Sequence, residues 1–317
     1  MPAEAVDPAG ATIAPGLIQI DTGYLRAGHT SAYLVIDNGR AAIIDTGVGH
    51  SVPRILSCLD ANGLDRDAVD WVIPTHVHLD HAGGAGGLMA ALPSARLGVH
   101  PSGEPHMVDP ARLEAGVRAL YGDAFFDREY APLTPVLAAR TVSLDEGATV
   151  SVGSRRLDVI HTPGHAWHQL GLFDSASAVF IAGDAFGASY PGYAEDASPF
   201  LIPVVPPPHF DPDAYYRTLA RIRELQPQRV APAHFPVIDA PGIAADRLQA
   251  MLEAAVEWTG QAESSDDLLQ RLIKGWGQWL PAGIEPAAFE RDFGLDLWLT
   301  AEGLWHWRQK QARRAAR

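Results

Sequence analysis

The stretch Thr75–Gly84, THVHLDHAGG, directly follows the apolar run Trp71–Pro74. It places four candidate metal ligands within six residues: His76, His78, Asp80 and His81. On a helix His76 and His78 would point in different directions, because side chains two residues apart do not share a face. A loop at the end of a strand can bring them together. We therefore expect a short buried strand that ends in a metal-binding loop.

Three further candidate ligands follow predicted strands. His165 stands in Thr162-Pro163-Gly164-His165, Asp184 ends the apolar run VFIAGD, and His234 ends the run RVAPAH. We expect the three strands to carry these side chains to one sheet edge. Imidazole and carboxylate ligands suit zinc, iron, manganese or cobalt. Cys58 is the only cysteine, so a site built from several thiolates and an internal disulfide are both excluded.

The pattern of apolar runs and turn residues predicts alternating strands and helices. Between the two groups of ligands, 101–140 is expected to be a helical excursion from the core. The Pro-rich stretch 189–210 is expected to be irregular, and Asp211 is expected to cap a helix that places Tyr216, Leu219 and Ile222 on one face. We expect strands at 17–20, 31–37, 40–47, 70–76 and 229–234, a helix at 52–63, a helix and then a strand within 86–100, short strands from 141 to 182, and helices after 241.

The composition excludes several kinds of partner. The formal net charge is -14 and the chain of 317 residues has only two lysines, Lys274 and Lys310. This charge opposes binding to nucleic acid or to an anionic membrane. The first residues lack the basic and apolar segments of a signal peptide, and no apolar run is long enough to span a membrane. The expected location is the cytoplasm, and the expected partner is a small-molecule substrate.

The ligand pattern resembles that of the metallo-β-lactamase-fold hydrolases, in the branch of glyoxalase II and the lactonases. The resemblance covers roughly residues 16–240. It implies an α+β fold, a four-layer αβ/βα sandwich with the metals at one edge of its two sheets. We expect residues 1–240 to form this catalytic domain and residues 241–317 to form a C-terminal helical subdomain.

The resemblance also assigns roles to the ligands. His76, His78 and His165 would hold one metal ion, Asp80, His81 and His234 would hold the other, and Asp184 would bridge them. The expected cofactors are two divalent ions, with zinc as first choice and iron or manganese as alternatives. Two such ions lower the pKa of a shared water, so that a bridging hydroxide attacks the substrate. Asp80 is the candidate catalytic residue, because its carboxylate can orient that hydroxide or pass a proton.

The expected reaction is cleavage of an ester, lactone or thioester bond in a small, apolar substrate. A mononuclear-iron enzyme similar to persulfide dioxygenases is the alternative enzyme, although it would leave Asp80, His81 and His234 unused. A metal-stabilised binding or regulatory module without catalysis is the alternative from another class.

Four residues outside the ligand set are candidates for supporting or substrate-binding roles. Asp45 is a candidate to support the metal loop or to cap a turn, and His168 to contact substrate or a ligand. Gly187 stands where lactonases usually have a substrate-binding Tyr, so Tyr190 or Tyr193 is a candidate replacement. Six of the eight tryptophans follow residue 257. They are expected to seal the C-terminal subdomain or to form a homodimer surface.

Overall fold

The structure is a computed structural model that describes residues 7–195 and 198–316, and within it the chain forms two compact units. The first unit contains the described residues up to His161 together with His168–Gly183. The second contains Thr162–Trp167 and the described residues from Asp184 onward. Each unit therefore includes part of the predicted ligand set. The predicted domain division at residue 240 stays a prediction, because a compact unit need not coincide with a domain.

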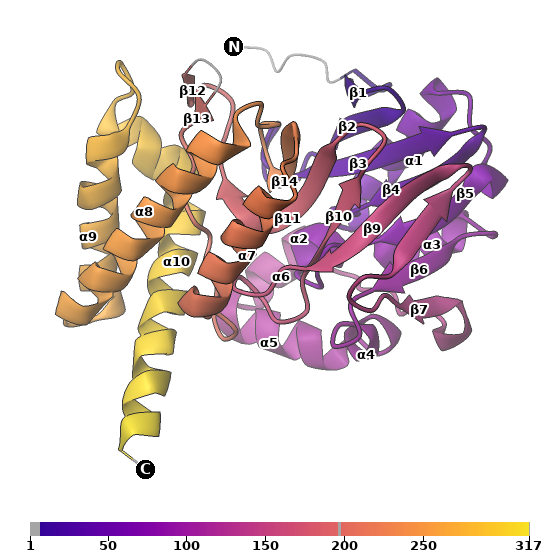
Figure 1. The fold of residues 1–317 in the computed structure, drawn as a ribbon. Helices are drawn as coiled ribbons and strands as arrows, with labels where there is room; N and C mark the ends of the chain where they lie inside the picture. The colour runs from indigo at the N-terminus through magenta and orange to yellow at the C-terminus, as the bar shows by residue number, and fades with distance from the viewer. Residues whose placement is uncertain (1–6, 196–197, 317) are drawn as a thin grey trace. The chain divides into compact units, whose positions relative to one another are not determined.

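A seven-stranded sheet lies in the first unit, with its strands side by side in chain order (Figure 1). The strands are antiparallel up to β4 and parallel from β4 to β7. Asn38 and Gly39 form the β3–β4 turn, and both have the positive φ that an Asn-Gly hairpin requires. The strands are β1 (Ala11–Ala14), β2 (Leu17–Asp21), β3 (Ser31–Asp37), β4 (Arg40–Ile44), β5 (Val69–Ile73), β6 (Arg96–Val99) and β7 (Thr141–Ser143).

Both faces of this sheet are covered. Side chains alternate between the faces of a strand, and Leu34 and Ile43 belong to a core that also contains side chains of α1 (Val52–Ala61) and α3 (Ala85–Ala91), such as Ile55. The strands β3 and β4 also contact β8 of the second sheet. Burial on both sides explains why these runs are apolar throughout instead of alternating.

The second sheet has the order β14-β11-β10-β9-β8. Its strands from β8 to β11 form successive antiparallel hairpins within the first unit, and β11 continues beyond Gly183 into the second unit. Gly183 has a φ of +55°, and a Cβ there would lie 2.6 Å from Thr75 Oγ1. This strand therefore passes too close to Thr75 for any larger residue. The strands are β8 (Thr149–Val152), β9 (Arg155–His161), β10 (Leu170–Asp174), β11 (Val179–Ala188) and β14 (Arg229–His234).

The segment 101–140 forms three short α-helices, as its sequence predicts. Phe126 and Tyr130 are buried together with Tyr24 and with Leu79 of α2. Phe126 is therefore a core residue of the first unit. The helices are α4 (Glu104–Val108), α5 (Ala111–Tyr121) and α6 (Asp123–Glu129), and α2 is the single turn Leu79–Ala82.

Four longer helices belong to the second unit. Asp211 caps α7 as predicted, because its side chain accepts a hydrogen bond from the Ala214 N–H. The buried face of α7 contains Leu219 and Tyr215, whereas Tyr216 is only half-buried, so the prediction for Tyr216 is wrong by one residue. No helix of the described residues is long and apolar enough to cross a membrane. The helices are α7 (Pro212–Glu224), α8 (Pro241–Gln261), α9 (Ser265–Trp276) and α10 (Pro286–Ala315).

The predicted irregular stretch 189–210 contains, in its described part, only the two-residue strands β12 (Ala194–Glu195) and β13 (Ser198–Pro199). Among the C-terminal tryptophans, Trp276 is fully buried and its indole N–H donates to the Met251 carbonyl at 3.1 Å. Trp279 is 43% exposed. A homodimer through this region stays a prediction.

A buried ion pair fixes the second sheet within the first unit. The Arg155 guanidinium donates to both carboxylate oxygens of Asp174 and to the Pro15 carbonyl. Burial alone would raise the pKa of Asp174, but the hydrogen bonds from Arg155 and Ser177 outweigh it and hold that pKa below its ordinary value. The stabilisation is therefore present above the unfolded pKa of about 3.9 and is lost as the pH falls through the lower folded value.

We expect Asp174→Asn to lower the free energy of unfolding by about 3–5 kcal/mol, because it leaves the Arg155 charge buried without its partner. Asp246→Asn is the matched control, since Asp246 pairs with Arg223 but its side chain is 72% exposed, and about 0–1 kcal/mol is expected there. Urea unfolding followed by tryptophan fluorescence and circular dichroism measures both. Equal effects of the two substitutions would contradict the structural role of the buried pair.

Candidate metal centre

The histidine motif lies in a loop at the end of β5, as the sequence predicts. The strand ends at Ile73 and the helical turn α2 begins only at Leu79, so His76 and His78 occupy non-helical backbone between them. Their ring nitrogens, His76 Nε2 and His78 Nδ1, are 2.9 Å apart. The loop thus brings together two imidazoles that a helix would separate.

The other two ligands of the motif turn toward the same place. The His81 ring centroid is 4.2 Å from that of His76, and His81 Nε2 is 3.2 Å from Asp80 Oδ2. His76 and His81 are fully buried, whereas the Asp80 side chain keeps 19% exposure. The first unit therefore gathers three imidazoles and one carboxylate, two from the loop after β5 and two, Asp80 and His81, from the helical turn α2.

Asp45 stabilises this loop through hydrogen bonds. It follows β4, is fully buried and has a φ of +59°, a conformation in which Asp is tolerated better than most residues. Its Oδ1 accepts hydrogen bonds from the Thr75 backbone N–H at 2.7 Å and from the Thr75 hydroxyl at 2.9 Å. Its Oδ2 lies 3.3 Å from His81 Nδ1. A single carboxylate therefore holds both the start of the loop and one of the ligands.

These contacts fix which ring nitrogens carry protons. A carboxylate only accepts, so His81 Nδ1 donates to Asp45, and neutral His81 then presents a lone pair on Nε2. The Thr75 hydroxyl donates to Asp45 and lies 3.2 Å from His76 Nδ1, so it accepts from that nitrogen and leaves the His76 lone pair on Nε2. A carboxylate that orients a ligand through its far nitrogen is a common support of metal sites.

His168 lies beside the motif, within the same unit. Its Nδ1 accepts a hydrogen bond from the Val77 N–H at 3.4 Å, and its ring lies nearly parallel to that of His76, with the centroids 6.2 Å apart. The ring is 5% exposed. His168, which the sequence indicates as a supporting residue, therefore lies next to His76 and to the backbone between His76 and His78.

The second unit brings together the other three predicted ligands. His165 Nε2 lies 3.4 Å from Asp184 Oδ2, and His234 Nε2 lies 3.6 Å from Asp184 Oδ1. All three side chains are almost fully buried. Each oxygen of Asp184 thus faces one imidazole.

Two groups that the sequence analysis did not single out hold this arrangement. His165 Nδ1 donates to the Val204 carbonyl at 2.8 Å, which leaves the lone pair on the nitrogen that faces Asp184. The Tyr215 hydroxyl donates to the Asp184 backbone carbonyl at 3.2 Å. Burial, with the nearby Asp184 charge, raises the pKa of Tyr215, so its hydroxyl keeps its proton. The only sequence signal was the helical pattern of α7, which indicated the neighbouring residue.

Tyr190 and Tyr193 are both engaged by α10 in the second unit. The Tyr190 hydroxyl donates to Asp296 at 2.6 Å, and the Tyr193 hydroxyl donates to Asp292 at 3.0 Å. Both rings also pack against Phe293. These contacts give the two residues a structural role, and the predicted substrate role stays a prediction.

A sequence model of the Metallo-beta-lactamase superfamily matches residues 25–234, about two thirds of the chain. The chain belongs to this superfamily. The predicted α+β fold is therefore confirmed, with two mixed sheets and C-terminal helices. The fold implies divalent metal binding, and the chain has His and Asp groups that are able to hold metal ions.

Three relatives illustrate the range of the superfamily. The metallo-beta-lactamase fold-containing protein ST1585 of Sulfurisphaera tokodaii is 26% identical over 70% of this chain and 78% of its own. Its crystal structure superimposes with a TM-score of 0.67 at 22% identity, covering 91% of this chain and 98% of that one, which shows the shared fold.

The other two relatives are named hydrolases. Acyl-coenzyme A thioesterase MBLAC2 of Bos taurus is 29% identical over 55% of this chain and 64% of its own length. The hydroxyacylglutathione hydrolase of Cupriavidus taiwanensis is 31% identical over 53% of each chain. The match thus spans between half and two thirds of these two proteins.

We expect Asp45→Asn to weaken metal affinity about 10–100-fold although it removes no ligand, because it removes the charge that orients His81 and Thr75. Asn tolerates the left-handed backbone that Asp45 adopts, so the loop backbone is kept. Metal content after dialysis against buffers of graded metal-ion concentration measures the effect.

Asp65→Asn is the control, since Asp65 is exposed in the same unit. Metal affinity equal to that of the unchanged protein in Asp45→Asn would contradict the role given to Asp45.

Proposed function

We propose that the protein is a metal-dependent hydrolase that cleaves a thioester bond, using two divalent metal ions. Zinc is the first choice of metal, with iron or manganese as alternatives. The proposed ligands are the seven predicted residues: His76, His78, Asp80, His81, His165, Asp184 and His234.

The observation that carries the proposal is the set of hydrogen bonds that the histidine rings make on the side away from the candidate site. Hydrogen bonds to Thr75, Asp45 and the Val204 carbonyl hold protons on one nitrogen each of His76, His81 and His165. The opposite nitrogen of each ring is left as a lone pair, the form that binds a metal ion. Because the remaining donors are imidazoles and carboxylates, the residues present fit divalent ions of the zinc type.

When bound, two divalent ions lower the pKa of a water and polarise a substrate carbonyl oxygen. The residues of the chain supply position and proton handling. The Asp80 side chain is partly exposed, so it can exchange a proton with solvent and pass it to the leaving group. His168 accepts the Val77 N–H at Nδ1, so its neutral form carries the proton on Nε2, where it can donate to a substrate oxygen.

Two considerations favour a thioester over an ester or lactone. The two relatives named as hydrolases act, by their names, on acyl groups carried by coenzyme A and by glutathione, which are both thiols. A thiolate leaving group also has a conjugate acid pKa of about 8.5, far lower than that of an alcohol, and needs little proton donation. Such a leaving group suits the proposed site, because Asp80 is the one partly exposed carboxylate among the seven proposed ligands and so the main candidate proton donor.

We expect the isolated protein to contain about two divalent ions per chain and to hydrolyse thioesters in a chelator-sensitive way. His76→Ala should lower thioesterase activity at least about 100-fold, because a lost ligand has at least the effect of a lost supporting group. The matched control is His50→Ala, since His50 is exposed in the same unit. Metal analysis and assays with a thioester, an ester and a lactone make the measurement.

Activity that is indifferent to chelator and to His76→Ala would contradict the proposal. Turnover of none of the three substrates, with metal-dependent thermal stability, would identify a binding module instead. One iron per chain without hydrolysis would favour the dioxygenase-like alternative.

A further inference from the structure

The last turns of α10 carry a concentration of positive charge in an acidic chain. No carboxylate follows Glu302 in the sequence, whereas Arg308, Lys310, Arg313 and Arg314 lie close together after it. The chain as a whole has a net charge of -14. The end of α10 thus differs in charge from the rest of the protein, and a local basic surface of this kind attracts anions.

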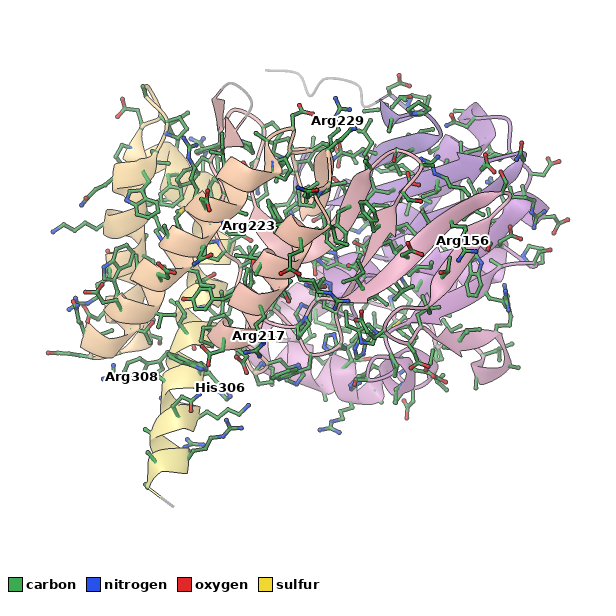
Figure 2. All side chains as sticks on the ribbon, viewed as in Figure 1. Arg156, Arg217, Arg223, Arg229, His306 and Arg308 are labelled. Carbon is green, nitrogen blue, oxygen red and sulfur yellow. The ribbon has the colours of Figure 1, made fainter. Side chains whose placement is uncertain are left out.

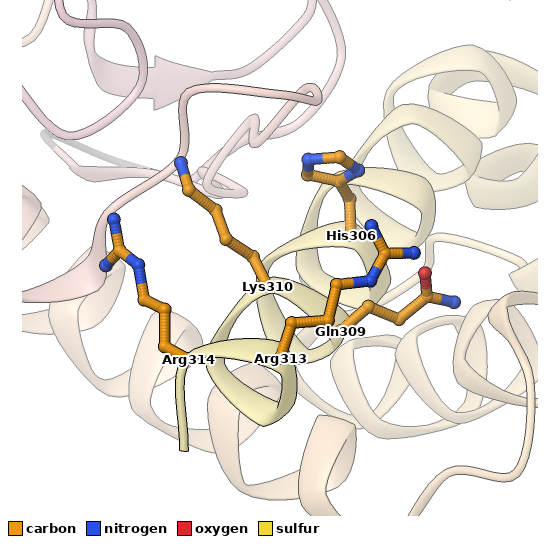
Figure 3. Close-up of a pocket in the computed structure, with 5 residues that line it drawn as sticks. All are labelled: His306, Gln309, Lys310, Arg313 and Arg314. Carbon is orange, nitrogen blue, oxygen red and sulfur yellow. The ribbon is translucent and has the colours of Figure 1, made fainter. Parts of the chain in front are cut away.

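Five side chains of this segment line a hollow of about 230 Å³ (Figure 3). They are His306, Gln309, Lys310, Arg313 and Arg314, and we name them the α10 basic pocket. Their spacing of three and four residues places all five on one face of the helix. The hollow lies wholly in the second unit.

The side chains of this pocket are not engaged by the protein. Within residues 7–195 and 198–316, no hydrogen bond or ion pair involves the side chain of His306, Lys310, Arg313 or Arg314. Arg308 differs, because it projects from the opposite side of α10 and donates to the Thr259 carbonyl at 2.8 Å (Figure 2).

Stabilisation of the helix end does not account for the pocket. Cations favour the last turn of a helix, and Arg313 and Arg314 lie there. Lys310 and His306 lie farther back along α10, where that effect has fallen off. The helix end therefore accounts for Arg313 and Arg314 but not for Lys310, and an anion bound in the hollow would interact favourably with all three.

Contacts within the second unit connect the pocket with a predicted metal ligand. Trp307, next to His306, packs against Phe210 with the ring centroids 6.1 Å apart. The following residue, Asp211, donates its backbone N–H to the Gly164 carbonyl at 3.0 Å, and Gly164 precedes His165. A continuous series of contacts within the second unit thus connects α10, next to the pocket, with the segment that carries His165.

We propose that the α10 basic pocket binds the phosphate groups of a coenzyme A thioester. The proposal rests on the proposed thioesterase function and names its acyl carrier. Coenzyme A joins an anionic phosphate end to the thioester through a pantetheine arm, which is comparable in length with an extended peptide of about four residues, or ~14 Å. Arg and Lys are the side chains that bind phosphate best. Glutathione has no phosphate, so this pocket selects the coenzyme A class.

The test compares an acyl-coenzyme A with the acyl-pantetheine that lacks its phosphates. The ratio of kcat/KM for the two substrates should fall about tenfold or more in the double variant Lys310→Gln and Arg313→Gln, because charge-assisted hydrogen bonds to phosphate are lost. Arg112→Gln is the control, since Arg112 is an exposed arginine of the first unit, and it should keep the ratio. An unchanged ratio in the double variant would overturn the proposal.

Titration calorimetry with free coenzyme A, 3′-dephospho-coenzyme A, pantetheine and inorganic phosphate separates this proposal from the proposed function. Coenzyme A should bind, more weakly at high salt and in the double variant, whether or not any thioester is hydrolysed. Inorganic phosphate that binds as tightly as coenzyme A, or an RNA oligonucleotide that binds more tightly, would overturn the assignment. Hydrolysis of acyl-pantetheine without coenzyme A binding would leave the thioesterase proposal standing and reject the pocket.

Discussion

The loop that carries His76 and His78 depends on the hydrogen bonds that the buried Asp45 carboxylate accepts. Asp45 lies directly after β4 and accepts two hydrogen bonds from Thr75, near the start of the loop, and one from His81 in the helical turn that follows the loop. A fully buried carboxylate is costly unless its oxygens are hydrogen-bonded, so the loop and the carboxylate stabilise each other. The loop is thus stabilised by a residue thirty positions before Thr75 in the chain, at the end of the neighbouring strand β4.

In the second unit, other groups orient the candidate metal ligands. There the backbone carbonyl of Val204 orients His165, and Tyr215 holds the main chain of Asp184. The segment that contains Val204 is in turn fixed by α10, because the Thr300 hydroxyl donates to the Pro203 carbonyl and accepts from the Val205 N–H. Gly303 is needed there, since a Cβ would lie 1.7 Å from the Val205 carbonyl oxygen. The C-terminal helix therefore supports the segment that orients His165, a predicted metal ligand.

The sequence predicted the strands, the helices and the grouping of the candidate ligands better than it predicted the residues that support them. Apolar runs and Asn-Gly turns located β3 and β4, because local chain preferences and burial act together there. The roles of Thr75 and Tyr215 depend on contacts between segments far apart in sequence, and no periodicity records these contacts. Helical spacing defines a face only to within about one residue, so it indicates Tyr216 where the structure buries Tyr215. The sequence likewise does not show that carboxylates of α10 accept hydrogen bonds from Tyr190 and Tyr193.

The prolines around Val204 have a consequence for the thermodynamics of ligand binding. Pro203 precedes Val204, and Pro206, Pro207 and Pro208 follow closely. Proline restricts φ in the unfolded as well as the folded chain, so ordering this segment reduces the conformational entropy less than it would in an ordinary loop. His165 is consequently held by a stiff backbone before any ligand is present. The entropic cost of arranging this part of the site arises during folding, and little of it opposes the later association with a metal ion or substrate.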